Sequence, residues 1–127
     1  MKLYVGYRGN RNTNVFVNKL GDVTTLDPGP SQAIVNHSPD GFEWAYNGSG
    51  PAQLALALLL DTSHDEALAQ YLHQEFKDEF VTGWGDRWFI SEKEIDRWIK
   101  DKVAAMSDTD RDYLGYLKEM AAIKAGG

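Results

Sequence analysis

Apolar and polar positions alternate along the first stretch of the chain. In "KLYVGYR" the side chains of Leu3, Val5 and Tyr7 occupy every second position, which predicts a strand that buries these three on one face. The segment "GNRNTN" is rich in turn-forming residues, and "VFVNKL" after it predicts the returning strand of a hairpin. The next segment, "GDVTTL", extends this pair to a β-meander.

Two further segments predict additional β structure. "DPGPS" has the composition of a loop, and Ala33 to Val35 predicts a short strand after it. "SPDG" then has proline and glycine at favoured places of a β-turn. From Phe42 to Tyr46 aromatic side chains alternate with Glu43 and Ala45, which predicts a well-packed strand.

Helical spacing replaces this alternation after residue 50. Pro51 suits the first turn of an apolar helix, where the missing N–H costs nothing. Ser63 with Glu66, and Ser91 with Glu94, have the spacing of capping boxes and predict two helix starts. The helix expected after the first of these boxes carries an apolar stripe formed by Ala67, Leu68, Tyr71, Leu72, Phe76 and Phe80.

The end of the chain completes the prediction of the fold. "RWFI" predicts a brief strand or an extended connection, and Ser107 or Thr109 starts the last helix, whose stripe consists of Tyr113, Leu117, Met120 and Ile123. Strands that precede helices indicate an α+β fold, an N-terminal antiparallel β-meander packed against a C-terminal set of three to four helices. We expect one domain over residues 1–127, β-rich over residues 1–50 and helical over residues 51–127.

The composition narrows the class of protein. The chain has 127 residues, 43% of them hydrophobic, which is typical of one globular domain. It has no cysteine, which excludes disulfides, thiolate metal sites and cysteine nucleophiles and is typical of a reducing compartment. The longest apolar run, Leu54 to Leu60, is far shorter than the ~20 residues of a membrane span. We therefore expect a cytoplasmic protein with no membrane contact.

The distribution of charge separates the two halves of the chain. The net charge is −6, and the charged residues of positions 1–50 balance, so the acidic excess lies in the helical half. This predicts no direct binding to nucleic acid, since that binding depends on cations that neutralise phosphates. Asp108, Asp110 and Asp112 lie together around the start of the last helix, where they complement the helix dipole or dock on a basic partner.

The stretch "WAYNGSGPAQ" carries the candidate ligand site. Gly48, Ser49 and Gly50 lead directly into a helix, and a glycine-rich turn at a helix N-terminus can hold a phosphate through its free N–H groups. The other candidate ligand-binding residues are Gln53 in the first turn, Trp44 and Tyr46 as stacking faces, and Arg8 and Arg11 from the first hairpin. The alternative is a structural corner in which the glycines permit a tight turn and the aromatic residues belong to the core.

No arrangement of side chains predicts catalysis or a metal site. His64 and His73 lie nine positions apart, too far for a paired set of zinc ligands on one helix. Ser49 is not in a nucleophile-elbow pattern, and neither the Walker nor the dinucleotide motif is present. We expect a protein that is not an enzyme and has no catalytic residue, metal or cofactor. Hydrolysis would require Asp61, His64 and His37 to converge.

Three segments resemble a small domain family of unknown function from bacteria, phages and plasmids. They are "GFEWAYNGSGPAQLALALLLD", "ALAQYLHQEF" and "WFISEKEIDRWI", and the "Y-x-G-x-R" strand of that family is similar to Tyr4 to Arg8. The resemblance covers most of residues 2–100, and the last helix is less similar. It implies an accessory protein in the conflict between phage and host, acting in the host cytoplasm where a phage encodes it.

Two functions follow from this resemblance and from the missing catalytic groups. The first is a non-enzymatic binding protein, a sponge that sequesters a small phosphate-bearing, nucleotide-derived immune signal at the Gly48–Gly50 turn. The second is an acidic inhibitor of a host defence protein, anti-CRISPR-like and imitating nucleic acid. A small domain gains a deep pocket most readily between subunits, so we also expect a homo-oligomer.

Overall fold

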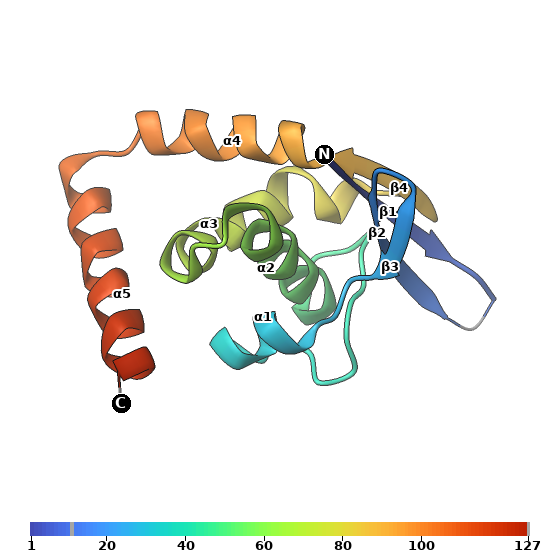
Figure 1. Cartoon of the computed structure of the whole chain (residues 1–127), viewed down its shortest axis with the longest axis horizontal. Coiled ribbons are helices and arrows are strands. Elements are labelled where there is room, and N and C mark those ends of the chain that lie inside the picture. Colours follow the sequence, from blue (N-terminus) through green and yellow to red (C-terminus); the bar gives the residue numbers. More distant parts are fainter. Residues whose placement is uncertain (11, 127) are drawn as a thin grey trace.

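The computed structural model describes residues 1–10 and 12–126 as a four-stranded sheet with helices gathered on one side of it (Figure 1). The strands are β1 (Lys2–Arg8), β2 (Thr13–Lys19), β3 (Asp22–Thr25) and β4 (Arg87–Ser91). The helices are α1 (Gly29–Ile34), α2 (Ser49–Ser63), α3 (Glu66–Glu79), the short 3-10 helix η1 (Val81–Gly83), α4 (Glu92–Ala104) and α5 (Asp108–Gly126). The α+β class predicted from the sequence is confirmed.

The sheet is antiparallel with the order β3-β2-β1-β4. Two hairpins join β1, β2 and β3 into the predicted meander. The fourth strand comes from "RWFI" late in the chain and pairs with β1, with Val5 opposite Phe89. The helical half of the chain thus supplies one edge of the sheet.

The prediction that Leu3, Val5 and Tyr7 form the buried face of β1 is wrong. Tyr4 is fully buried under the helices together with Gly6, whereas Leu3 and Val5 are only half-buried and Tyr7 is exposed. Two long-range contacts set this orientation. The Tyr4 hydroxyl donates to Asp61 Oδ2 of α2 at 2.7 Å, and the ring of Trp88 occupies the space beside Gly6.

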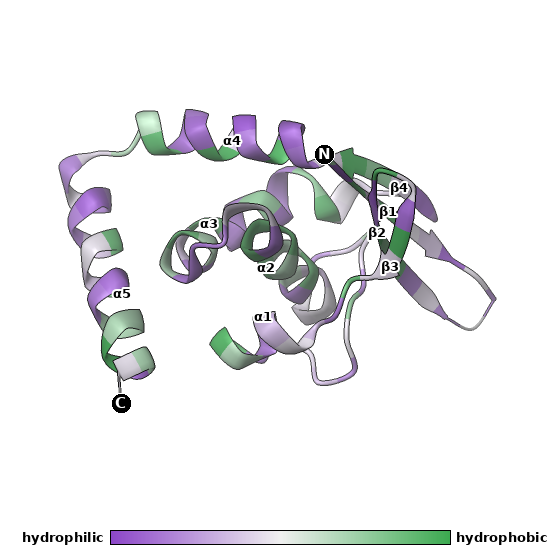
Figure 2. Ribbon diagram, in the orientation of Figure 1, coloured by the Kyte–Doolittle hydropathy of each residue, from purple (hydrophilic) through white to green (hydrophobic). Residues whose placement is uncertain are grey.

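Helix α2 forms the centre of the core. All ten residues from Gly50 to Leu59 are buried, as expected for a helix that is apolar on every side. Figure 2 shows α2 mostly green, whereas α4 alternates purple and green along its length. Helix α4 is accordingly a surface helix that buries only Ile95 and Ile99.

Two predicted strands are absent from the described residues. Ala33 lies in α1, where Pro30 preorganises the first turn, and Val35 is the extended residue that ends this helix. The segment from Phe42 to Tyr46 is irregular, with Ala45 at φ 76°. Its backbone groups bond to scattered partners instead of a neighbouring strand, since the Ala45 N–H donates to the Val81 carbonyl.

The helix starts agree with the sequence in three cases of four. Pro51 lies in the first turn of α2, and Ser91 with Glu94 forms the predicted capping box of α4. The last helix begins at Asp108, one residue after Ser107. The Ser63–Glu66 box is wrong, because α2 runs to Ser63 and the α3 cap is Asp65, which accepts from the Leu68 N–H at 3.1 Å.

Candidate functional site

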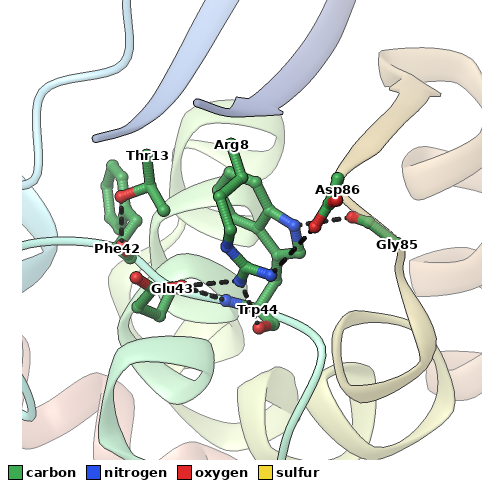
Figure 3. A network of polar contacts seen from close by, with 7 residues as sticks. All are labelled: Arg8, Thr13, Phe42, Glu43, Trp44, Gly85 and Asp86. Atoms are coloured by element: carbon green, nitrogen blue, oxygen red, sulfur yellow. Dashed lines mark hydrogen bonds and ion pairs between the residues drawn. The ribbon is translucent and has the colours of Figure 1, made fainter. Parts of the chain in front are cut away.

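Arg8 joins three segments that are distant in sequence (Figure 3). Its Nη2 donates to Glu43 Oε1 at 2.7 Å and to the Trp44 carbonyl at 2.8 Å. Its Nη1 donates to Asp86 Oδ1 at 3.4 Å. The structure therefore brings Arg8 to the entry of α2, where two carboxylates neutralise its charge.

Trp44 is a core residue. Its side chain is fully buried, and its indole N–H donates to the Gly85 carbonyl at 2.7 Å. The ring of Trp88 meets it edge-on at 5.6 Å, and Arg8 Cζ lies 5.0 Å from its centroid. Neither face of this ring is free to stack a base while these contacts persist.

The turn into α2 is tightly packed at Gly50. A Cβ on this residue would lie 2.6 Å from the Cβ of Glu43, so only glycine fits beside this side chain. Gly48 is the N-terminal cap residue of α2, and since it has no side chain, no side-chain hydrogen bond caps this helix. Ser49 and Tyr46 are exposed, and the ring of Tyr46 lies beside Gly48. Among the candidate ligand-binding residues of this turn, these two have exposed side chains.

Gln53 faces inward from the first turn of α2 and is fully buried. Its Oε1 accepts from the backbone N–H groups of His37 at 2.8 Å and Ser38 at 3.1 Å. Its Nε2 donates to Ser31 Oγ at 2.9 Å. Gln53 thereby fixes α1 and the following loop to α2, a structural role that leaves its amide occupied.

The candidate residues therefore divide into two groups. Arg8, Trp44 and the Gly48–Gly50 turn lie together, while Gln53 points away into the core. Arg11 lies outside the described residues. Internal contacts account for Arg8, Trp44 and Gly50 as parts of a structural corner. The side chains of Ser49 and Tyr46 are exposed.

The three residues named for hydrolysis do not converge. Asp61 and His64 line one cavity of about 370 Å³, but His37 bonds to His73. Asp61 also accepts from Lys2 Nζ at 3.2 Å, an ion pair that fixes its carboxylate beside Tyr4. Among residues 1–10 and 12–126, no group of three or more His, Cys, Asp or Glu side chains is placed to hold a metal ion.

The sequence predicts a single apolar stripe on the last helix. In the structure the apolar side chains of α5 form two sets, one buried and one exposed. Leu114 and Leu117 are buried against α3. Beside them runs an exposed apolar row, the α5 stripe, which consists of Tyr113, Tyr116, Met120 and Ile123 with exposed fractions of 53%, 52%, 41% and 65%. The spacing of three, four and three residues places these four side chains on one face of the helix. This spacing is visible in the sequence.

Acidic residues border the α5 stripe on one side. Asp112 and Glu119 immediately precede Tyr113 and Met120, so both lie on the edge away from the buried leucines, and both are exposed. Asp108 lies one turn before Asp112 on the same edge and is also exposed. The stripe therefore lies between the body of the protein and an acidic edge.

Asp110 does not belong to this edge. Its Oδ1 accepts from the Tyr71 hydroxyl of α3 at 2.6 Å, and its Oδ2 accepts from the Ser107 N–H at 3.0 Å. The first of these bonds lowers the pKa of Asp110 and raises the pKa of Tyr71 to about 12. Asp110 thus fixes the start of α5 to α3, and only two of the three aspartates named from the sequence face solvent.

In the described part of the chain, every helix is too short or too polar to cross a membrane. No curated protein and no solved structure matches the chain. A model of a family of unknown function (DUF6166) matches residues 4–101, from β1 into α4, and leaves α5 outside the match. The match covers well over half of the sequence, and the chain therefore belongs to this family of unknown function.

Proposed function

We propose that the chain is a non-enzymatic binding protein that docks on a basic protein partner through α5. The observation that carries this proposal is the exposed α5 stripe with its acidic edge. Exposed aromatic and methionine side chains in one row are typical of protein interfaces, and tyrosine is frequent among the residues that dominate binding energy.

The chemistry of the partner follows from the acidic edge. A partner segment that fills the α5 stripe lies beside Asp108, Asp112 and Glu119, and it is favoured when it carries Lys or Arg at its own edge. The net charge of −6 adds a long-range attraction for a basic surface. The occupant that fits best is an amphipathic helix with an apolar row and basic flanks.

The biological setting in this proposal is the one that the sequence resemblance implies. The chain is encoded by a phage or another mobile element, acts in the host cytoplasm and blocks a basic site on a host defence protein. Its acidic edge then occupies a surface that would otherwise bind nucleic acid. Such a role needs tight binding without turnover and so needs no catalytic group.

The test uses designed peptides as probes of the α5 stripe. One peptide has leucines at helical spacing with lysines on both edges, and a matched peptide has glutamates in place of the lysines. We expect the lysine peptide to bind in fluorescence anisotropy, with an affinity that falls as salt rises. Tyr116→Ala should weaken this binding by about tenfold, the loss of one interface anchor.

Charge reversal supplies the decisive comparison. Asp112→Lys should weaken binding of the lysine peptide. Asp40→Lys is the matched control, because it changes the net charge equally at an exposed position in the loop between α1 and α2, and it should weaken binding less. Equal effects of the two variants, or equal binding of the two peptides, would contradict a specific basic partner at α5.

A second candidate is the sequestering of a small phosphate-bearing ligand at the start of α2. It is favoured by the exposed Ser49 and Tyr46 beside a helix N-terminus that has no acidic residue in its first turn. A thermal-unfolding screen with linear and cyclic nucleotides tests it. Ser49→Glu, which places a negative charge on the exposed position, should remove any stabilisation, and Ser63→Glu at the other end of α2 is the matched control.

A further inference from the structure

The outer face of the sheet carries apolar side chains on all four strands. They are interspersed with the polar residues Asn14, Asn18, Thr25, Arg87 and Ser91. On this face the registers place Phe16 of β2, Val5 of β1 and Phe89 of β4 side by side in one row. Phe89 is 72% exposed, Tyr7 42% and Val23 of β3 58%. Several large apolar side chains thus share this face, and three of them, Phe16, Val5 and Phe89, are direct neighbours across the strands.

No described helix covers this face, because the helices lie on the other side of the sheet (Figure 1). An antiparallel sheet with one solvated face normally alternates apolar residues inward and polar residues outward. Strand β1 departs from this rule, since Leu3, Val5 and Tyr7 point outward while Tyr4 and Gly6 are buried. A face of this composition is typical of a surface covered by a partner.

The charges on this face indicate what covers it. Among its described outward positions only Arg87 is charged, and its guanidinium lies 5.1 Å from the centroid of the Tyr7 ring. The acidic excess of the chain lies elsewhere, so two copies can meet here without opposing their carboxylates. Single-stranded nucleic acid also stacks on aromatic sheet faces, but it needs a track of cations that one arginine does not supply.

The size of the face suits a modest interface. Four strands at the usual spacing and rise give a projected area of roughly 400 Å², and the corrugated accessible surface is larger. Standard interfaces bury about 800 Å² on each partner, so contact through this face alone falls at the low end. A dimer built on it should dissociate at micromolar concentrations.

We infer that the outer face of the sheet is the interface of a homodimer in which two sheets pack face to face. Phe16, Val5 and Phe89 form its central row, and Tyr7 with Arg87 lies next to them. Two aligned sheets pack about 10 Å apart with interdigitated side chains, as in β-sandwiches. The two copies are related by a twofold axis in the plane of contact, which pairs the same face of each. This interface is independent of the α5 stripe and leaves it free.

The test is sedimentation velocity from about 1 to about 500 μM, a range that spans micromolar dissociation constants. The unmodified chain should convert from monomer to dimer. Phe89→Glu removes an exposed apolar anchor and should weaken the dimer at least about tenfold. Phe16→Glu, on the next strand but one, should do the same.

Ile123→Glu is the matched control, because it places the same charge on the exposed α5 stripe. It should leave the dimer unchanged. Circular dichroism checks that each variant remains folded, and the high exposure of Phe89 makes its variant the safer of the two.

Three results would overturn the inference. One is a chain that stays monomeric over the whole range. Another is a dimer that Ile123→Glu dissociates and Phe89→Glu does not. The third is a monomer that binds a single-stranded oligonucleotide probe and loses this binding in Phe89→Glu.

Discussion

His37 and His73 face each other with their Nε2 atoms 3.0 Å apart. The Nδ1 of His73 lies 2.6 Å from the Gln70 carbonyl and donates its proton there, so its Nε2 carries a lone pair and accepts from His37. The pair joins the loop after α1 to α3, while the His37 N–H donates to Gln53 of α2. This contact requires the His73 ring to be neutral, because a proton on its Nε2 would meet the Nε2–H of His37.

The first prediction is that acid weakens the fold through this pair. Burial is the main cause that lowers the pKa of both histidines from the ordinary value of 6.5, and the Lys77 charge lowers them further. The unfolded chain therefore binds more protons below about pH 6.5, and the free energy of unfolding falls as the pH drops through this window. Urea unfolding between about pH 5 and 8 measures this slope.

Substitution separates the pair from general acid effects. His73→Gln should flatten the dependence on pH between about 5 and 7, and it should lower stability at pH 7 because the contact is lost. His64→Asn removes a histidine outside the pair and should keep the slope. A slope unchanged in His73→Gln would show that other groups are responsible.

The second prediction concerns the role of Arg8. Arg8→Ala removes donors to Glu43, Asp86 and the Trp44 carbonyl and uncovers the ring of Trp44. We expect a loss of about 1–2 kcal/mol in stability, moderated because the side chain is 29% exposed. Thermal and urea unfolding measure it. Arg8→Lys should recover only part of the loss, because an ammonium cannot reproduce the planar fork of donors.

A different effect on stability is expected if the role of Arg8 is to bind a ligand. Its removal would then leave the free protein as stable as before, and it would abolish the stabilisation by nucleotides. Unfolding with and without the nucleotide panel distinguishes these two roles.

How much of the fold could be predicted depends on whether each signal is local. Ser91 and Glu94 bond only across one helical turn, and the capping box predicted from their spacing is confirmed. The orientation of β1 depends on Asp61, 57 positions from Tyr4, and on Trp88 beside Gly6. An alternating pattern with aromatic residues in both phases cannot reveal such distant contacts.

The candidate site shows the same difference between local signals, which the sequence reveals, and distant contacts, which it does not. The sequence proposes Arg8 of the first hairpin as a candidate for the turn into α2 but cannot show whether it faces that turn. In the structure Arg8 donates to the Trp44 carbonyl at the entry of α2. The sequence pattern does not show that Glu43 and Asp86 neutralise it, because one of these precedes α2 and the other precedes β4. The burial of Gln53 likewise depends on the loop at His37 and Ser38, which follows the segment wrongly predicted as a strand.

The third prediction tests the contact between Gly6 and Trp88. A Cβ at position 6 would overlap the indole ring, which also stacks on Trp84 at 4.1 Å. Gly6→Ala should therefore cost about 1–3 kcal/mol, the usual cost of overpacking. Gly115→Ala is the matched control, because nothing lies near its Cβ in α5, and it should stabilise the protein by about 0.5–1 kcal/mol. A stable Gly6→Ala protein would mean that Trp88 moves freely.

The fourth prediction concerns the turn into α2. Gly50 has no positive φ, so its requirement for glycine is one of space, since a Cβ there would lie 2.6 Å from the Glu43 Cβ and 3.2 Å from the Glu43 N. Gly50→Ala should lower stability by about 1–3 kcal/mol without any ligand. Ser49→Ala, at the exposed neighbouring position, should change it by less than about 0.5 kcal/mol. If Gly50→Ala is as stable as the unmodified chain and only nucleotide binding is lost, the turn serves a ligand, and the structural-corner interpretation of these glycines is wrong.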